Sequence, residues 1–576
     1  MYIFYVSRRI PFSEVERYLN MTINSEKALQ EFKIIPDYLK DMTVGTQPLN
    51  RKKNRYRNNL PYDETRVKLS IINDDPSSDY INANHIQGYS SIKYIATQGP
   101  MDQSLSTVKD FWRMIVEQQV TAIIMVSSFE EGQSKVAQYM NYEETLEFGN
   151  YSTQVVSSLQ RPHFTVSQIQ VFVDGKPEHI VTHYHYTNWP DHGVPDEEYS
   201  ISYLITFFLN THDDGGGVVV HSSAGTGRTG SVLMVLLLHE MLKIEGNIDP
   251  IEVLIRLRGG RGHLVENIDQ YNLALMITEE LLFGNITAVT PFDLKNDLRS
   301  LLPRASSEFE KVKSMLTPLS YKYSSSQAVR HLNRNPDILP SDNHRVYLQK
   351  TNGEESQYIN AVQIHGFKKK DRFLVTEHPL RETQARFWRM IMEKRCPCVV
   401  LINHYAENSE EEFPSILPED GKEMNVSGYK ITVCSPVPSG SDLMEYTVTV
   451  ENPGVQGLCH TLTAYVVLNW EYGSPTPGSP NVLLNLADKL LQPGALSNPG
   501  PTLLCCGDGV TGCGLLVGLI FILQRVHNED VADIYRAVVK LLRYRYQFIT
   551  CKEQYAMLYY AASNYLKDFP TYVVVN

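Results

Sequence analysis

The first 395 residues contain no cysteine, because the first of the eight cysteines in the chain is Cys396. The spacing of these eight matches neither a small disulfide-bonded scaffold nor a paired CxxC zinc site. We therefore expect reduced thiols, as in a cytosolic protein. The absence also excludes a cysteine from any reaction carried out by the first half of the chain.

Positive charge and long apolar runs are also scarce. Lys and Arg number 53 against 65 Asp and Glu, which gives a net charge of -12, and there is no basic block. This balance argues against nucleic acid as a partner. The longest apolar stretches, such as GLLVGLIFIL from Gly514, are shorter than the roughly 20 residues that span a bilayer. We expect that the chain as given does not cross a membrane.

What the chain does contain is a long-range repeat. FWRMI occurs at Phe111 and again at Phe387, and DYINANHIQGY around Tyr80 matches QYINAVQIHGF around Tyr358. YTNWPDHGVP likewise matches VVLNWEYGSP, and DQYNLAL matches EQYAMLY. Since 576 residues are too many for one core, the repeat predicts two homologous domains in tandem.

Within each repeat, β-branched runs alternate with longer helical patterns, which predicts an α/β (α+β) fold. We expect a helical lead-in over residues 1–45 and a first domain over 46–290. A charged, proline-containing stretch predicts a linker over 291–308. The second domain is then expected over 309–570.

The segment HSSAGTGRTG, residues 221–230, lies between a β-branched run and a long apolar helical pattern. A glycine-rich turn at a helix start directs several backbone N–H groups at one point, which favours an anion. Arg228 adds a planar guanidinium suited to phosphate oxygens. The segment matches neither a Walker A loop nor a dinucleotide motif. Taken alone, it is also compatible with a plain turn that happens to expose an arginine.

Four further motifs accompany this segment in a fixed order: KNRYRNNLPYD, DYINAN, ATQGP and NWPDHGVP. Together the five resemble the catalytic domain of the protein-tyrosine phosphatases, and the tandem arrangement resembles the cytoplasmic part of receptor-type members. The resemblance implies two tandem domains, each with a twisted mixed sheet flanked by helices. It implies phosphotyrosine-containing proteins as partners, contact between the domains, and neither metal nor cofactor. It also implies a location on the cytoplasmic side of a membrane, with the tether supplied by a preceding segment.

In that family a cysteine thiolate attacks the phosphorus, an aspartic acid protonates the leaving phenol, and water then hydrolyses the phosphocysteine. The resemblance assigns the catalytic positions to Ser222, Asp191, Arg228, Thr229 and Gln270. It assigns substrate binding to Tyr56, Asn58, Ser223, Ala224, Gly225, Thr226, Gly227, Arg228 and Glu266. In this assignment Asp191 is the acid on a hinged loop, Tyr56 sets the pocket depth, and Gln270 places the water.

Three of these positions depart from the family pattern. Ser222 stands at the position of the nucleophilic cysteine, Glu266 at that of a glutamine, and Asn58 at that of an aspartate. A serine hydroxyl needs a base to attack, and the neighbouring His221 should point to the opposite face of its strand. We therefore predict that the first domain binds phosphotyrosine and hydrolyses it slowly or not at all.

Two origins are compatible with Ser222: a natural inactive phosphatase, or an engineered change that traps substrate. Glu266 and Asn58 favour the natural origin, because trapping requires neither. An ionised Glu266 close to bound phosphate would weaken capture, whereas a side chain pointing away would leave it unaffected.

The second domain departs differently. Aligning CCGDGVTGCG with the first segment places Cys506 opposite Ser222 and Gly512 opposite Arg228. Glu471 and Tyr472 replace the Pro-Asp pair of the closing loop, and Asn335 lies opposite Tyr56. We predict no catalysis here. Cys505 and Cys506 at a helix start are compatible with redox sensitivity or with a structural role, and the lack of a neighbouring cation in the sequence favours the structural role.

Three functions follow for the chain. The first is a receptor-type phosphatase region that captures phosphotyrosine with its hydrolysis disabled. The second is an active phosphatase in the parent protein, if residue 222 is natively cysteine. The third is a scaffold that binds no phosphate.

Overall fold

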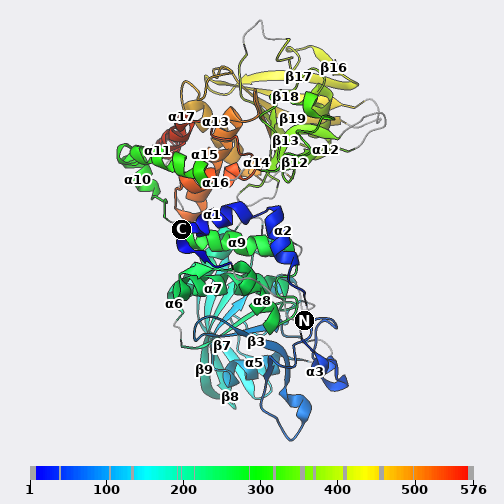
Figure 1. Cartoon of the computed structure of the whole chain (residues 1–576), viewed down its shortest axis with the longest axis vertical. Helices are drawn as coiled ribbons and strands as arrows, with labels where there is room; N and C mark the ends of the chain where they lie inside the picture. The colour runs from blue at the N-terminus through cyan, green and yellow to red at the C-terminus, as the bar shows by residue number, and fades with distance from the viewer. Residues whose placement is uncertain are drawn as a thin grey trace. The chain divides into compact units, whose positions relative to one another are not determined.

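The chain folds into two compact units, Met1–Phe283 and Gly284–Asn576, in a computed structural model (Figure 1). The structure describes residues 8–37, 40–102, 106–131, 135–161, 163–190, 193–195, 198–212, 215–284, 286–315, 319–349, 357–366, 371–405, 411–452, 459–496 and 499–568. Each unit is described by itself below.

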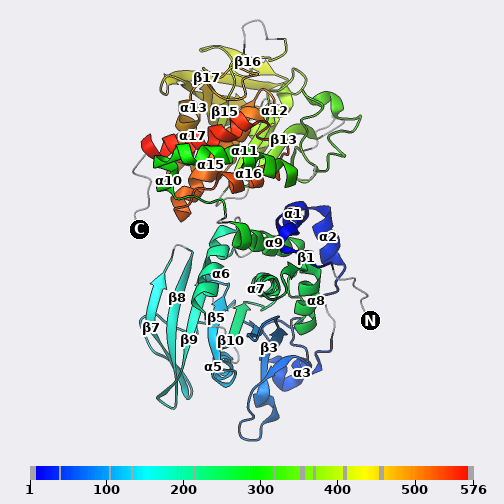
Figure 2. The same ribbon diagram turned by 60° about the vertical axis from the view of Figure 1, so that its left-hand side comes forward.

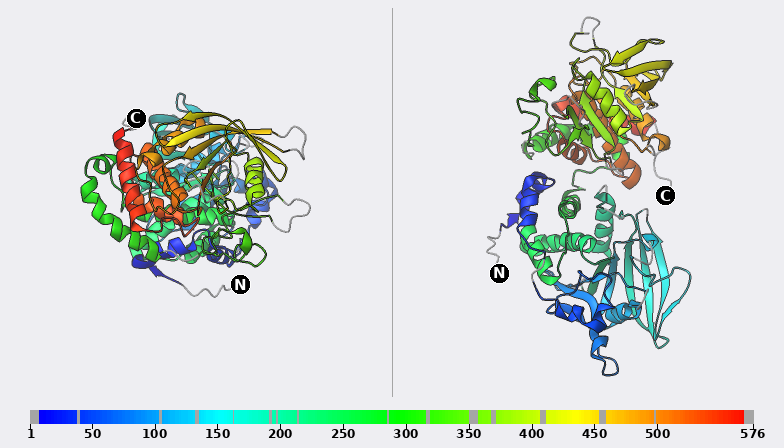
Figure 3. Two further views of the ribbon diagram at one scale, coloured as in Figure 1. Left: turned by 90° about the horizontal axis from the view of Figure 1, so that it is seen from above. Right: turned by 90° about the vertical axis from the view of Figure 1, so that its right-hand side faces the viewer.

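The first unit contains a mixed sheet whose strand order, over the described residues, is β2-β3-β4-β10-β5-β9-β8-β7-β6. These strands are β2 (Arg66–Lys68), β3 (Tyr80–Gln87), β4 (Lys93–Gln98), β5 (Val120–Met125), β6 (Leu146–Phe148), β7 (Tyr151–Gln160), β8 (Phe164–Val173), β9 (Lys176–Tyr186) and β10 (Gly217–Ser222). The long antiparallel strands of residues 151–186 are cyan in Figure 3. A short pair, β1 (Ile10–Pro11) with β11 (Asn247–Ile248), lies outside this sheet.

Strand β10 lies inside this sheet, with parallel neighbours β4 and β5 on either side. All six of its residues are buried, which explains its run of valines, because a parallel strand is covered on both faces. The carboxyl ends of adjacent parallel strands meet at one edge, where α/β proteins bind ligands. The chain leaves β10 at Ser222 on that edge.

Helices cover both faces of the sheet. They are α1 (Phe12–Thr22), α2 (Glu26–Lys33), α3 (Thr43–Thr46), α4 (Pro48–Arg51), α5 (Val108–Glu117), α6 (Tyr199–Thr211), α7 (Gly227–Glu245), α8 (Pro250–Gly260) and α9 (Ile268–Phe283). Val218 and Val220 of β10 share a buried cluster with α6 to α9, which form one layer (Figure 2), whereas Val219 packs with α5 on the other face. In the stretch where a lead-in was expected, α1 buries Val15 and Leu19 and α2 buries Ala28 in the first of these clusters.

The second unit repeats this architecture, and its sheet order over the described residues is β12-β13-β14-β20-β15-β19-β18-β17-β16. The strands are β12 (Arg345–Tyr347), β13 (Tyr358–Ile364), β14 (Phe373–Glu377), β15 (Cys398–Leu401), β16 (Glu423–Val426), β17 (Tyr429–Pro438), β18 (Leu443–Glu451), β19 (Cys459–Val467) and β20 (Thr502–Cys506). The helices are α10 (Pro291–Asn296), α11 (Leu298–Met315), α12 (Gln384–Lys394), α13 (Asn481–Leu491), α14 (Pro493–Leu496), α15 (Thr511–Glu529), α16 (Ile534–Leu542) and α17 (Lys552–Asp568). The expected pair of mixed sheets flanked by helices is confirmed.

The stretch predicted as a linker, residues 291–308, is structured and belongs to the second unit. It forms α10 and most of α11, whose Leu294, Leu301, Ala305 and Phe309 are buried in the core with α15 to α17. The charged residues that suggested a linker share these helices with buried apolar ones. Among the described residues, no helix is long and apolar enough to cross a membrane.

Candidate phosphate-binding site

The turn between β10 and α7, residues 222–228, is called the phosphate loop below. It reverses the chain at the edge where β10 ends, so its backbone lies at the start of a 19-residue helix. Gly225 in this turn has φ +68°, and a side chain there would overlap the carbonyl oxygen of Thr97. Only glycine fits both the backbone angle and the space.

Arg261, which is 1% exposed, supports the phosphate loop by hydrogen bonds to its backbone carbonyl groups. Its Nε donates to the carbonyl oxygen of Gly225 at 2.9 Å, and Nη2 donates to that of Ala224 at 3.2 Å. The same guanidinium donates to Asn82 Oδ1 at 2.7 Å and Asn84 Oδ1 at 2.9 Å. These asparagines belong to the DYINAN motif, and their i, i+2 spacing places both on one face of β3. The DYINAN motif therefore supports the phosphate loop indirectly, through Arg261.

Ser222 lies at the base of the loop and is 3% exposed. Its Oγ is 3.0 Å from Thr229 Oγ1 and accepts from the Gly225 amide at 3.3 Å. His221 lies on the other face, where its Nε2 is 2.7 Å from the hydroxyl of Tyr139. Burial lowers the pKa of His221 to about 3, so the imidazole stays neutral. Ser222 Oγ thus contacts one backbone amide and one hydroxyl, while the imidazole of His221 is bonded on the other face.

Arg228, at the start of α7, is directed by an ion pair with Glu131, in which Nη1 is 2.7 Å from Oε1. Its Nη2 donates to the carbonyl oxygen of Pro190 at 3.0 Å. The guanidinium therefore contacts both Glu131 and Pro190, which belongs to the NWPDHGVP motif. Glu131 was not identified from the sequence, since a glutamate in a polar stretch gives no local signal.

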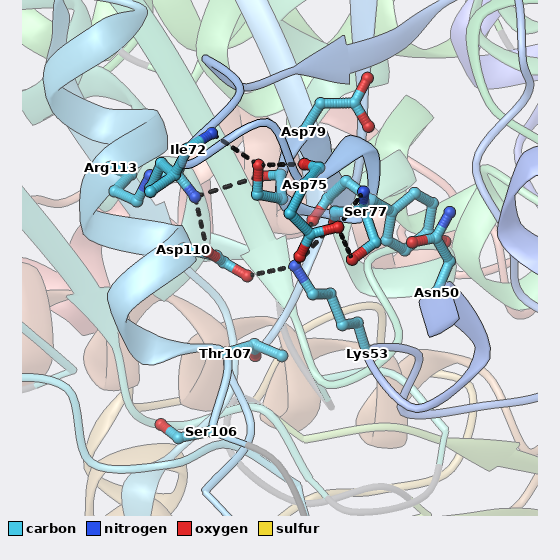
Figure 4. Close-up of polar contacts among 12 residues, drawn as sticks. Asn50, Lys53, Ile72, Asp75, Ser77, Asp79, Ser106, Thr107, Asp110 and Arg113 are labelled. Carbon is cyan, nitrogen blue, oxygen red and sulfur yellow. Dashed lines mark hydrogen bonds and ion pairs between the residues drawn. The ribbon is translucent and has the colours of Figure 1, made fainter. Parts of the chain in front are cut away.

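Tyr56 reaches the phosphate loop from a different segment, and its hydroxyl is 2.9 Å from Ser223 Oγ. The segment is anchored by Lys53, whose Nζ donates to Asp110 Oδ2 at 2.8 Å and to the carbonyl oxygens of Ser77 and Tyr80 at 3.2 Å each (Figure 4). This anchoring brings the ring of Tyr56 to the rim of the loop.

Glu266 and Gln270 approach the same turn from the start of α9. Glu266 Oε1 accepts from Thr226 Oγ1 at 2.7 Å, and its Oε2 would lie 2.6 Å from a Cβ on Gly227. Gln270 Nε2 would lie 2.5 Å from that carbon, and its Oε1 accepts from the Glu266 amide at 2.8 Å. Of the two orientations considered for Glu266, the structure has the one that faces the loop.

Two further predicted residues are Asp191 and Asn58. Asp191 lies outside the described residues, although Trp189 beside it is buried and donates to the carbonyl oxygen of Gly193 at 3.3 Å. Asn58 is exposed. Arg261 and Lys53 were missed, although both belong to sequence segments rich in glycine or basic residues.

The second unit has an equivalent turn between β20 and α15, with Cys506 at its base and 1% exposed. The backbone N–H of Arg334 donates to Glu377 Oε1 at 2.9 Å, as that of Arg55 donates to Gln98 Oε1 in the first unit. This correspondence supports placing Asn335 opposite Tyr56.

The two mixed sheets flanked by helices place the chain among the α/β proteins, and the first of them ends in a strand-loop-helix turn that has Arg228 at the helix start and Tyr56 beside it. The family model described as protein-tyrosine phosphatase matches residues 50–280 and again 329–564. The chain therefore belongs to the protein-tyrosine phosphatase family and carries two tandem phosphatase domains.

The chain is similar to several receptor-type members. It is 30% identical over 594 residues to human receptor-type tyrosine-protein phosphatase alpha, covering 98% of this chain and 72% of that protein. It is 30% identical over 582 residues to human receptor-type tyrosine-protein phosphatase C, covering 92% and 44%. It is 29% identical over 546 residues to a Caenorhabditis elegans Lar-like tyrosine-protein phosphatase, covering 91% and 24%. The chain thus spans less than half the length of the latter two relatives.

Proposed function

We propose that the first domain captures phosphotyrosine in proteins and leaves the phosphate ester intact. The observation that carries this proposal is Ser222 Oγ at the base of the phosphate loop, next to Thr229 Oγ1 and the Gly225 amide. A ring of donors can stabilise a thiolate at this position, because a thiol ionises readily. The same ring gives no base to a hydroxyl, which holds its proton far more tightly.

Capture itself relies on groups that remain in place. The amides of residues 223–228 and the guanidinium of Arg228 would surround the phosphate oxygens. Tyr56 at the rim would stack on the substrate ring and favour the long phosphotyrosine side chain over the shorter phosphoserine. Thr229 and Gln270 correspond to residues that act on the phosphoenzyme in the family, and here they would have no phosphoenzyme to act on. Asp191 corresponds to the acid that protonates the leaving phenol, a step that does not occur without an attacking group.

The position of Glu266 favours a moderate affinity for phosphotyrosine over a very high one. Its carboxylate faces the loop, so it would repel a bound dianion, although its exposure to water screens that repulsion. Glu131 also neutralises part of the charge of Arg228. Both effects reduce affinity without removing the amide donors.

By its similarity to receptor-type relatives, we also propose that the chain acts on the cytoplasmic side of a membrane, tethered through a preceding segment. The contact between the two domains stays a prediction. The two alternatives are an active phosphatase, if residue 222 is natively cysteine, and a phosphate-independent scaffold.

Binding of a phosphotyrosine peptide and its unphosphorylated twin tests capture against the scaffold. We expect binding of the phosphorylated peptide alone. Arg228→Lys should weaken it about 10- to 100-fold, since a charged, two-pronged hydrogen bond contributes roughly 1.5–3 kcal/mol. Arg51→Lys, at an exposed arginine of the same unit, is the matched control and should leave affinity unchanged. Equal binding of both peptides, or no effect of Arg228→Lys, would contradict the proposal.

A further inference from the structure

The turn of the second unit, residues 506–512, keeps the shape of the phosphate loop. Gly509 has φ +68°, the same angle as Gly225. Arg545, which is 0% exposed, donates to the carbonyl oxygen of Gly509 at 2.9 Å and to Asn360 Oδ1 at 2.6 Å, as Arg261 does in the first unit. The second domain therefore still presents a turn built to direct amides at one point.

A carboxylate of the chain itself occupies that point. Asp508 Oδ1 accepts from the amides of Val510 at 2.8 Å and Thr511 at 2.9 Å. Its Oδ2 accepts from Thr511 Oγ1 at 2.6 Å, and the thiol of Cys506 donates to Oδ1 at 3.3 Å. Both carboxylate oxygens are therefore engaged by groups of the turn.

The corresponding position in the first unit is Ala224, which has no side-chain acceptor. Val510 and Thr511 correspond to Thr226 and Gly227, whose amides are among those assigned to phosphate. We propose that Asp508 takes the place of the phosphate group in the second domain and thereby closes this turn to phosphotyrosine. The inference concerns the second domain and rests on the assignment of the first domain's loop amides to phosphate, but its readout at Cys506 is separate from peptide binding by the first domain.

Side chains around the turn complete the closure. The ring of Tyr472 lies against the α-carbon of Gly507, leaving no space for a side chain there, and its centroid is 4.8 Å from that of Phe413. At Gly512, opposite Arg228, a Cβ would lie 2.5 Å from Ile402 Cγ2. An entering phosphate would thus meet an aromatic ring and a carboxylate, without the arginine that binds it in the first domain.

The same arrangement determines the state of Cys506. Cys506 is 1% exposed and its thiol donates to Asp508 Oδ1 at 3.3 Å, so the sulfur is both shielded from solvent and engaged by the carboxylate. The cysteine at the nucleophile position is therefore difficult for a reagent to reach, and Asp508 is the residue that both contacts this sulfur and occupies the turn.

Alkylation of Cys506 by iodoacetamide in the full chain, quantified by peptide mass spectrometry, tests this inference. In the unmodified chain we expect slow alkylation relative to the exposed Cys434 and Cys459, and no protection by tungstate, which mimics phosphate. Asp508→Ala should accelerate alkylation at least tenfold and make it sensitive to tungstate. Because the readout is at Cys506, tungstate bound in the first domain does not contribute.

Asp508→Asn keeps an oxygen acceptor for the two amides and removes the charge. It should accelerate alkylation without tungstate protection, and it also covers the case in which Asp508→Ala fails to fold. Asp420→Ala, at an exposed aspartate of the same unit, is the control and should change neither property. Tungstate protection of Cys506 in the unmodified chain would overturn the inference. So would an unchanged alkylation rate in folded Asp508→Asn.

Discussion

Replacing Arg261 with lysine should release the phosphate loop and weaken phosphotyrosine capture without changing any atom proposed to contact the ligand. Arg261 makes four hydrogen bonds from one buried guanidinium, two to the loop carbonyls of Ala224 and Gly225 and two to asparagine side chains. A lysine ammonium is a single point with three donors and cannot reach acceptors on both sides.

The magnitude follows from the bonds lost. At least two charge-assisted hydrogen bonds disappear, each contributing roughly 1.5–3 kcal/mol. The free energy of unfolding of the first unit should therefore fall by about 3 kcal/mol or more, a large share of the roughly 5–15 kcal/mol typical of a domain. Affinity for a phosphotyrosine peptide should fall more than tenfold, because the loop amides lose their common direction.

Thermal unfolding and peptide binding are measured on the same samples, at a temperature where the variant is folded. Arg545→Lys is the matched control, because this guanidinium supports the equivalent turn of the second unit. It should destabilise the second unit and leave peptide affinity unchanged. Parent-like affinity in folded Arg261→Lys would refute the reasoning that this arginine shapes the site.

Two further perturbations follow from the charges around the site. Glu266→Gln should tighten binding of a phosphotyrosine peptide about two- to fivefold at low salt. The gain should be smaller at high salt, because the carboxylate is exposed and therefore screened. Isothermal titration at two ionic strengths measures both values, and no gain in affinity would place the carboxylate away from the ligand. Burial lowers the pKa of His185 to about 4 and of His221 to about 3, from 6.5, so the unfolded chain takes up protons that the folded unit excludes. The free energy of unfolding of the first unit should have its full value above pH 6.5. It should fall by about 1.4 kcal/mol per pH unit for each histidine as the pH drops towards 4, which denaturant titration measures. His185→Gln should flatten this dependence.

Much of this architecture could be predicted from the sequence, because an internal repeat and a glycine-rich turn can both be recognised without knowing which residues are in contact. The two mixed sheets and the turn at Ser222 are of this kind. The helices within residues 291–308 were not foreseen, because charged residues and Pro303 obscured a helical pattern in which Leu301, Ala305 and Phe309 recur every four residues and are buried.

The supports of the site could not be predicted in the same way. Glu131 and Arg261 lie 97 and 36 residues from the positions they contact, and only the folded chain brings them to Arg228 and Gly225. The carboxylate of Asp508 was visible in the sequence, but whether it faced the turn depended on side-chain geometry.

The central claim is that the first domain holds the phosphate ester and cannot break it. Phosphate release from a bound phosphotyrosine peptide should be measured under identical conditions for the unmodified chain and for Ser222→Cys, with Arg228→Lys as the background. The account predicts release by Ser222→Cys and none above background by the unmodified chain, although that chain binds the peptide. Appreciable phosphate release by the unmodified chain would contradict it.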